Sequence, residues 1–189
     1  MRPAARPQEL VVVVGLQASG KSTWVAGHLA GTHVVVSKDH WPRARHREAR
    51  QQRVVAELLA EGRSVVVDNT SPSVAERAPL IAIAAAACVP VRAVFLDVPL
   101  GTCRERNDAR TGAARVPLVG LHAAAGRLVA PTTAEGFTEV TVVRAVGGEG
   151  VLPQAAGPEE ERGRGTAAAA IPEGSIAQTC LRPGSAAQP

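Results

Sequence analysis

A glycine-rich loop near the start of the chain constrains its fold more than any other feature. Residues 15–22 read GLQASGKS and match the pattern GxxxxGK[ST] in full. An apolar run, Leu10 to Val14, precedes the loop, and a helix is predicted over 21–29 behind it. Gly15 and Gly20 permit a tight backbone path whose N–H groups point inward at phosphate oxygens. The pattern therefore predicts a strand, an anion-binding loop and a helix, in that order.

The same loop predicts a nucleoside triphosphate site. Lys21 is expected to reach the terminal phosphates, Ser22 can ligate Mg²⁺, and the N-terminus of the helix adds positive potential. The expected cofactors are ATP and Mg²⁺. The predicted nucleotide-binding residues are Gly15, Gln17, Ala18, Ser19, Gly20, Lys21, Ser22 and Thr23. The alternative is a chance match in a chain rich in Gly and Ser, and the strand–loop–helix context argues against it.

The segments beyond the loop alternate between short β-branched runs and helical stretches. Further strands are expected at 33–36, 64–67, 91–96 and 138–143, with helices at 42–61, 72–88, 100–109 and 117–128. Strands without polar alternation, separated by helices, indicate a parallel sheet that is covered on both faces. We predict an α/β fold of the P-loop NTPase class, with a five-stranded parallel sheet, helices on both faces and a small lid.

The composition divides the chain near Val146. Residues 147–189 contain 13 Gly or Pro among 43 residues and no aromatic residue, so this segment is predicted to be a disordered tail. The tail holds three Arg and five Glu, a net charge of −2. Residues 1–146, the predicted folded domain, hold 18 basic and 12 acidic groups, a net charge of +6. This positive charge favours an anionic partner.

Several classes of protein are excluded by what the chain does not contain. No apolar run approaches the roughly 18 residues that cross a bilayer, so no membrane partner is expected. No signal-peptide cleavage pattern is seen and the three cysteines are scattered, which together lead us to expect a cytoplasmic protein. The five histidines show no metal-ligand spacing. The oligomeric state is left open.

Two acidic residues are expected at the carboxyl ends of strands, where ligands of open α/β sheets bind. Asp68 directly follows Val67 and is predicted to lie on the magnesium side, although it could instead cap the next turn. Asp39 follows the strand that ends at Val36. A carboxylate there can accept a proton from an attacking hydroxyl, and the alternative is a cap of the following helix.

Arginines are concentrated in two places. Arg43, Arg47 and Arg50 share one face of the helix predicted over 42–61, and this stripe would suit a phosphate-bearing acceptor. The alternative is a solvated face, since 19 of the 21 basic residues in this chain are Arg. Arg104, Arg106 and Arg110 precede a small-residue loop at 111–115 that resembles a mobile lid, although Arg104 and Arg115 could instead be surface arginines of a short helix. Lid arginines stabilise the charge of a transferring phosphoryl group.

Taken together, these motifs resemble the polynucleotide 5′-hydroxyl kinases, including the kinase domains fused to nucleic-acid phosphatases, within the AAA-type P-loop ATP-binding proteins. The resemblance covers roughly residues 10–144. The matching pieces are Gly15 to Thr23, Lys38-Asp39, Val65 to Thr70, Arg77, 96–99, 106–110, Val116-Pro117 and Glu135-Gly136-Phe137. Lys38 stands where an Arg is more usual, and there is no phosphatase signature of the DxDxT type. The resemblance therefore implies a kinase unit alone, over residues 1–146.

The resemblance implies roles for individual residues. Lys21 and Ser22 would lie at ATP–Mg²⁺, and Asp39 would be the general base toward a 5′-hydroxyl. Arg110 would be the lid arginine on the phosphates. Arg43 falls most naturally where an arginine holds the phosphate of the acceptor, although its spacing to Asp39 differs among relatives. Lys38, beside the base, is expected near the acceptor.

We therefore expect an ATP-dependent phosphotransferase that moves the γ-phosphate to a hydroxyl, most naturally the 5′ end of a polynucleotide. Two alternatives stay open. One is a kinase on the same fold that phosphorylates a nucleoside, a sugar or an antibiotic. The other is an ATP-binding module without transfer activity, against which the complete loop, Asp39 and Arg110 argue together.

Overall fold

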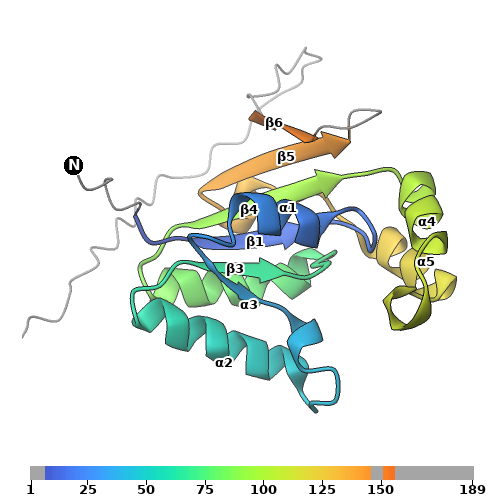
Figure 1. The fold of residues 1–189 in the computed structure, drawn as a ribbon. Helices are drawn as coiled ribbons and strands as arrows, with labels where there is room; N and C mark the ends of the chain where they lie inside the picture. The colour runs from blue at the N-terminus through green and yellow to red at the C-terminus, as the bar shows by residue number, and fades with distance from the viewer. Residues whose placement is uncertain (1–6, 146–150, 156–189) are drawn as a thin grey trace, which may run out of the picture. The chain divides into compact units, whose positions relative to one another are not determined.

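A computed structural model describes residues 7–145 and the backbone of one further strand at 151–155. Its centre is a six-stranded sheet in the order β2-β3-β1-β4-β5-β6 (Figure 1). The first five strands are mutually parallel, and the sixth pairs antiparallel with the fifth. The strands are β1 (Leu10–Val14), β2 (Val34–Val36), β3 (Val65–Asp68), β4 (Val91–Asp97), β5 (Glu139–Ala145) and β6 (Val151–Ala155).

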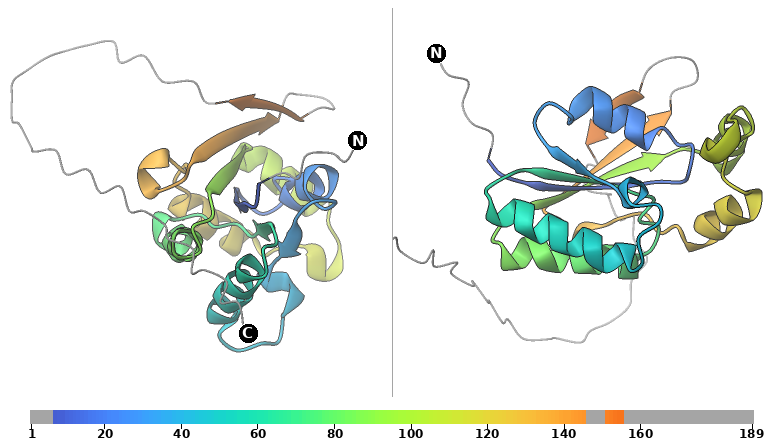
Figure 2. Two further views of the ribbon diagram at one scale, coloured as in Figure 1. Left: turned by 90° about the vertical axis from the view of Figure 1, so that its left-hand side faces the viewer. Right: turned by 60° about the horizontal axis from the view of Figure 1, so that its bottom comes forward.

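Helices cover both faces of this sheet. They are α1 (Lys21–His28), α2 (Arg47–Ala60), α3 (Val74–Ala86), α4 (Leu100–Asp108) and α5 (Leu118–Arg127), with short 3₁₀ turns at Lys38–His40, Gly112–Ala114 and Thr133–Glu135. Figure 2 shows α1 on one side of the sheet and α2 with α3 on the other. The predicted five-stranded parallel sheet with helices on both faces is thus confirmed.

Strand β1 consists entirely of apolar residues because helices cover it on both faces. All five residues of β1 are fully buried. Val12 packs in the core cluster that contains Val55 and Leu80 of α2 and α3, whereas Val13 packs with Trp24 and other residues on the opposite face. Successive side chains of a strand point to opposite faces, so both faces of β1 must be apolar when helices cover both.

The start of the second long helix differs from the prediction. The helix was expected from Pro42, but α2 begins at Arg47. A 3₁₀ turn forms first over Lys38–His40, where the Ser37 side chain accepts a hydrogen bond from the Asp39 N–H. His46 then adopts a left-handed conformation with φ of 55°, which a right-handed helix cannot contain. Arg43 consequently lies outside the helix that carries Arg47.

The carboxyl-terminal boundary of the domain also differs from the prediction. Strand β6 lies inside the segment 147–189 that was expected to be a disordered tail, and the compact unit extends to Ala156. Without β6, β5 would present a row of unpaired N–H and C=O groups, which another extended segment can pair with whatever its composition. The rest of the predicted tail, residues 146–150 and 156–189, lies outside the described residues.

None of the helices within the described residues is both long enough and apolar enough to cross a membrane.

Candidate active site

The glycine-rich loop joins β1 to α1 with the predicted backbone geometry. Gly15 and Gly20 have φ of +154° and +96°, and Gly20 is the residue before the first turn of α1. A Cβ atom on Gly15 would lie 3.0 Å from Ser19 Oγ and 3.1 Å from the Leu96 carbonyl oxygen. Because one of these neighbours is backbone, a side chain at Gly15 would displace the loop from β4.

Lys21 begins α1 with its side chain almost buried. Its Nζ donates a hydrogen bond to the Leu16 carbonyl oxygen at 2.6 Å. Burial lowers the pKa of the Lys21 ammonium to about 8, and the nearby Asp68 carboxylate partly opposes this effect. A phosphate group beside Nζ would favour the charged form, so this lysine suits an anionic ligand.

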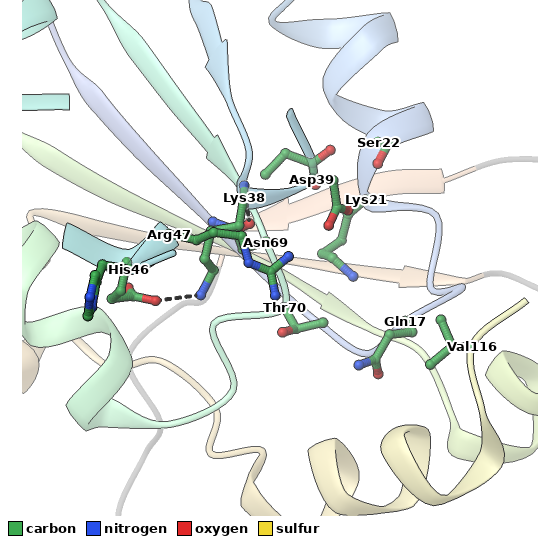
Figure 3. Close-up of a pocket in the computed structure, with 12 residues that line it drawn as sticks. Gln17, Lys21, Ser22, Lys38, Asp39, His46, Arg47, Asn69, Thr70 and Val116 are labelled. Atoms are coloured by element: carbon green, nitrogen blue, oxygen red, sulfur yellow. Dashed lines mark hydrogen bonds and ion pairs between the residues drawn. The ribbon is translucent and has the colours of Figure 1, made fainter. Parts of the chain in front are cut away.

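A cavity of about 600 Å³ opens in front of this lysine at the carboxyl ends of the strands (Figure 3). It collects side chains from the glycine-rich loop, the turn after β2, the end of β3 and the start of α2. Its lining residues are Gln17, Lys21, Ser22, Lys38, Asp39, His46, Arg47, Glu48, Asp68, Asn69, Thr70 and Val116. Seven residues that the sequence nominated therefore meet at one cavity: Gln17, Lys21, Ser22, Lys38, Asp39, Arg47 and Asp68.

The segment after β3 links the two sides of this cavity. The Gly15 N–H donates to the Thr70 carbonyl oxygen at 3.1 Å, and the Lys38 N–H donates to Asn69 Oδ1 at 3.1 Å. Asn69 and Thr70 thus connect the phosphate-binding loop with the turn that carries Asp39. The sequence showed both residues in the run after Asp68, but only the fold shows what they join.

The side of the cavity that faces Asp39 carries two of the expected cations, Arg47 and Lys38, but not Arg43. Arg47 and His46 line it, and Lys38 Nζ donates to Glu48 Oε2 at 2.8 Å. Arg43 is exposed and is not among the residues that line this cavity, so the structure does not bring it to the other predicted site residues. The late start of α2 explains this difference, because it leaves Arg43 in the preceding loop and places Arg47 in the first turn.

A second cavity, of about 460 Å³, lies beside the loop. It is lined by Ala18, Ser19, Gly20, Thr23, Trp24, His28, Leu96, Arg106 and Arg110. Trp24 and His28 stack with ring centroids 4.6 Å apart. Ser19 Oγ and Trp24 Nε1 are buried and have no hydrogen-bond partner among the described residues. Trp24 both packs in the core and lines the cavity, since its residue is only 8 % exposed.

Two arginines of α4 and the loop behind it reach this second cavity. Arg110 was predicted, and Arg106 lies one helical turn before it. Arg106 Nη1 donates to the Ser19 carbonyl oxygen at 3.4 Å, so it contacts the phosphate-binding loop directly. Arg106 was not among the predicted site residues; its four-residue spacing from Arg110 is a signal in the sequence that could have indicated it.

Helices α4 and α5 lie together as an arm beyond the carboxyl end of β4 (Figure 1). Its connecting loop is held by Asn107, which is fully buried, donates to the Val116 carbonyl oxygen at 2.8 Å and accepts from the Val116 N–H at 2.9 Å. On the other side of the loop, Arg115 Nη2 forms an ion pair with Asp108 Oδ1 at 2.9 Å. The arm occupies the position of the predicted lid, and Val116 itself lines the larger cavity.

The residues present fit a magnesium ion that is shared with a nucleotide. Ser22 and Asp68 offer hard oxygen donors at the same cavity, as Mg²⁺ prefers. Within the described ranges, no group of three or more His, Cys, Asp or Glu side chains could hold a metal ion by itself. Such a site matches Mg²⁺, which commonly takes one or two protein ligands and completes its shell with phosphates and water.

The chain matches the model of the family described as AAA domain over residues 10–130. It is 31 % identical, over 141 residues, to the bifunctional polynucleotide phosphatase/kinase of Schizosaccharomyces pombe. That match takes in 72 % of this chain but only 33 % of the relative, so the chain spans about a third of the curated protein it matches.

Solved structures share the fold at low identity. A fungal RNA kinase superposes with a TM-score of 0.59 at 13 % identity, covering 77 % of this chain and 79 % of that one. A sugar kinase from Janibacter superposes with a TM-score of 0.56 at 19 % identity, covering 73 % and 86 %. The chain therefore belongs to the AAA-domain family of P-loop proteins, and its fold is that of the P-loop kinases.

Proposed function

We propose that this chain is an ATP-dependent kinase that transfers the γ-phosphate to the 5′-hydroxyl of a polynucleotide. The main support is one juxtaposition: Asp39 lines the same cavity as Lys21 and Ser22, with Arg47 at its edge. A carboxylate, a phosphate-binding lysine and an acceptor-side cation are the groups that phosphoryl transfer to the hydroxyl of an anionic substrate requires. The likeness to a polynucleotide phosphatase/kinase supports the choice of acceptor.

On the donor side, the loop amides and Lys21 would hold the β- and γ-phosphates. The second cavity would receive the nucleobase, since Trp24, His28 and Leu96 give it an apolar lining beside the loop. Ser19 Oγ and Trp24 Nε1 are donors without partners there and could meet acceptor atoms of a base. Arg106 and Arg110 border this cavity and would place positive charge beside the phosphates.

Ser22 and Asp68 are the residues that would hold Mg²⁺. When bound, the ion neutralises charge on the β- and γ-phosphates. Both protein groups are oxygen donors on neighbouring elements, the first turn of α1 and the end of β3.

On the acceptor side, Asp39 would orient the 5′-hydroxyl and take its proton. The hydroxyl oxygen then bonds to the γ-phosphorus while the bond from that phosphorus to the β–γ bridging oxygen breaks and ADP leaves. The 3₁₀ turn over Lys38–His40 and the Ser37 cap fix the backbone that carries this carboxylate. Catalysis of this kind depends on positioning and charge stabilisation more than on covalent chemistry.

An ATP γ-phosphate transfer assay tests the proposal. Labelled ATP is offered with 5′-hydroxyl DNA, 5′-hydroxyl RNA and pooled nucleosides and sugars. We expect label on an oligonucleotide, with transfer that weakens steeply as salt rises, because phosphate contacts release counterions. Asp39→Asn should lose transfer while it retains ATP binding. Near-normal turnover in that variant would overturn the assignment of the base.

A small-molecule kinase is the second candidate. The observation that favours it is the size of the site: one cavity of about 600 Å³ holds both the loop residues and Asp39. The same assay separates the candidates, because a neutral small acceptor should show little salt dependence. A nucleotide-binding module without transfer activity predicts ATP binding and no labelled product with any acceptor.

A further inference from the structure

Two residues that phosphoryl transfer leaves without a role meet in the core. Arg77 of α3 and Glu135 lie 58 positions apart and form a bidentate ion pair. Arg77 Nε donates to Glu135 Oε2 and Arg77 Nη2 donates to Glu135 Oε1, each at 2.7 Å. The side chain of Arg77 is 0 % exposed and that of Glu135 is 7 % exposed. This is a buried, fully hydrogen-bonded pair and not a surface contact.

The third nitrogen of the guanidinium group, Nη1, lies within hydrogen-bond distance of three backbone carbonyl oxygens. Arg77 Nη1 lies 3.1 Å from the oxygen of Ser71, 3.2 Å from that of Pro72 and 3.0 Å from that of Val129. The Val129 N–H in turn donates to the Pro72 oxygen at 2.8 Å. Ser71 has φ of +41°, a conformation that residues other than glycine rarely adopt. The hydrogen bonds from Arg77 therefore stabilise the segment just after β3 in a backbone conformation that is unfavourable by itself.

That segment is the one that joins the donor and acceptor sides of the larger cavity. Immediately before Ser71, the Thr70 oxygen accepts from the Gly15 N–H, and Asn69 Oδ1 accepts from the Lys38 N–H. If Ser71 moved, Asn69 and Thr70 would move with it. That movement would displace the phosphate-binding loop and the turn that carries Asp39.

The carboxyl end of the α4–α5 arm contacts the same segment after β3. Val129 follows α5, so its two hydrogen bonds tie the end of the arm to Pro72 and Arg77. On the other side, Glu135 Oε1 also accepts from the Thr132 N–H at 3.1 Å, which closes the turn before β5. Gly136 has φ of +109°, and a Cβ there would lie 2.9 Å from Ile81 Cγ2, so the residue after Glu135 must be small to pack on α3.

We propose that Arg77 and Glu135 are a positioning pair for phosphoryl transfer. They fix the 69–72 segment so that the phosphate-binding loop, the Asp39 turn and the end of the arm keep one relative arrangement. The guanidinium group is required because only a planar fork offers two donors to a carboxylate and a third to carbonyls on its other side. This inference rests on the proposed kinase function.

A second bidentate pair at the other end of the sheet, with the same geometry but partly exposed side chains, provides the control. Arg92 donates to Glu9 from Nε and Nη2, at 3.1 and 3.0 Å, also in a bidentate pair between distant segments. Glu9 precedes β1 and Arg92 is near the start of β4, so this pair lies at the amino ends of the strands. Arg77→Lys and Arg92→Lys are compared in the full chain, at a temperature where both are folded.

We expect both variants to lower the melting temperature. Only Arg77→Lys should lower kcat, by about tenfold or more, because small misplacements of reacting groups have effects of that size. Its Kd for Mg²⁺·ADP should change by less than about threefold, because the loop amides and Lys21 remain. Hydrogen exchange should become faster at Gly15 and Lys38 in Arg77→Lys and stay unchanged in Arg92→Lys.

Unchanged kcat and unchanged exchange at Gly15 and Lys38 in Arg77→Lys would overturn the proposal and leave a structural ion pair. If Arg77→Lys does not fold, Glu135→Gln replaces it in the same comparison, because the amide keeps an acceptor for Arg77 and removes the charge. If the unmodified chain transfers no phosphate to an oligonucleotide, the proposed function fails. The positioning proposal is then decided by the exchange rates, which need no acceptor.

Discussion

The Asn69 side chain accepts a hydrogen bond from the backbone N–H of Lys38 at 3.1 Å, across 31 positions of sequence. This single contact ties the segment after β3 to the turn that carries Asp39. Since the neighbouring Thr70 oxygen accepts from the Gly15 N–H, the orientation of the proposed base is connected to the phosphate-binding loop through two adjacent residues.

Removing this contact should impair transfer more than nucleotide binding. Asn69→Ala deletes the acceptor for the Lys38 N–H, and a hydrogen bond of this kind contributes about 1 kcal/mol net, which corresponds to roughly a fivefold loss in kcat. Steady-state kinetics and Mg²⁺·ADP titration measure the two effects. Thr138→Val removes a comparable side-chain hydrogen bond to the Val91 oxygen at the other end of the sheet and should leave kcat unchanged. Equal losses in both variants would contradict the prediction.

ATP affinity should fall as the pH rises through about 8. The pKa of Lys21 is lowered to about 8 by burial, so the ammonium loses its proton over this range in the free protein. Bound phosphate favours the charged form, and binding near pH 8.5 should therefore take up a proton. Calorimetry in two buffers of different ionisation enthalpy measures this uptake. Lys21→Met should bind ATP weakly and without the uptake, whereas uptake that persists in it would assign the proton to another group.

The acceptor arginine can be identified by comparing two neighbours. Arg47 lines the larger cavity and Arg43 does not, so Arg47→Ala should raise the KM for a 5′-hydroxyl oligonucleotide by about tenfold, as expected for a lost contact to a charged group. The affinity for the oligonucleotide should also depend less on salt. The slope of log K against log[salt] should become smaller in magnitude by about 0.7, the value for one phosphate of a single strand. Arg43→Ala is the matched control and should change neither. The opposite result would restore the assignment drawn from the sequence.

The Glu9 carboxylate should stabilise the fold above pH 4.5 and lose this effect in acid. Hydrogen bonds from His33 and Arg92 lower the pKa of Glu9 to about 2 from its ordinary 4.5. The native state therefore binds protons less readily than the unfolded chain, and the stabilisation declines as the pH falls from 4.5 toward 2. Urea unfolding at pH 7 and pH 3 should show a smaller difference in Glu9→Gln than in the unmodified chain. Glu57→Gln, which removes an exposed partner of Arg53, should behave like the unmodified chain.

The sequence alone was sufficient to predict the glycine-rich loop and the position of Asp39 at the same edge of the sheet. The run from Leu10 to Ser22 encodes strand, loop and helix locally, because its apolar residues, glycines and lysine are consecutive. Asp39 and Asp68 could be brought together without coordinates, since parallel strands end at one edge of a sheet. These inferences needed only local pattern and one rule of topology.

Only the tertiary structure decided the rest. Arg47, and not Arg43, lines the larger cavity because the left-handed turn at His46, which helix periodicity does not reveal, sets where α2 begins. Arg77 and Glu135 could be seen as separate motifs, but their pairing depends on how α3 packs against the turn before β5. Strand β6 was missed because pairing with an open sheet edge depends on the edge and not on composition. Local residues thus determined the chemistry that is available, and contacts between distant segments determined which of those residues meet.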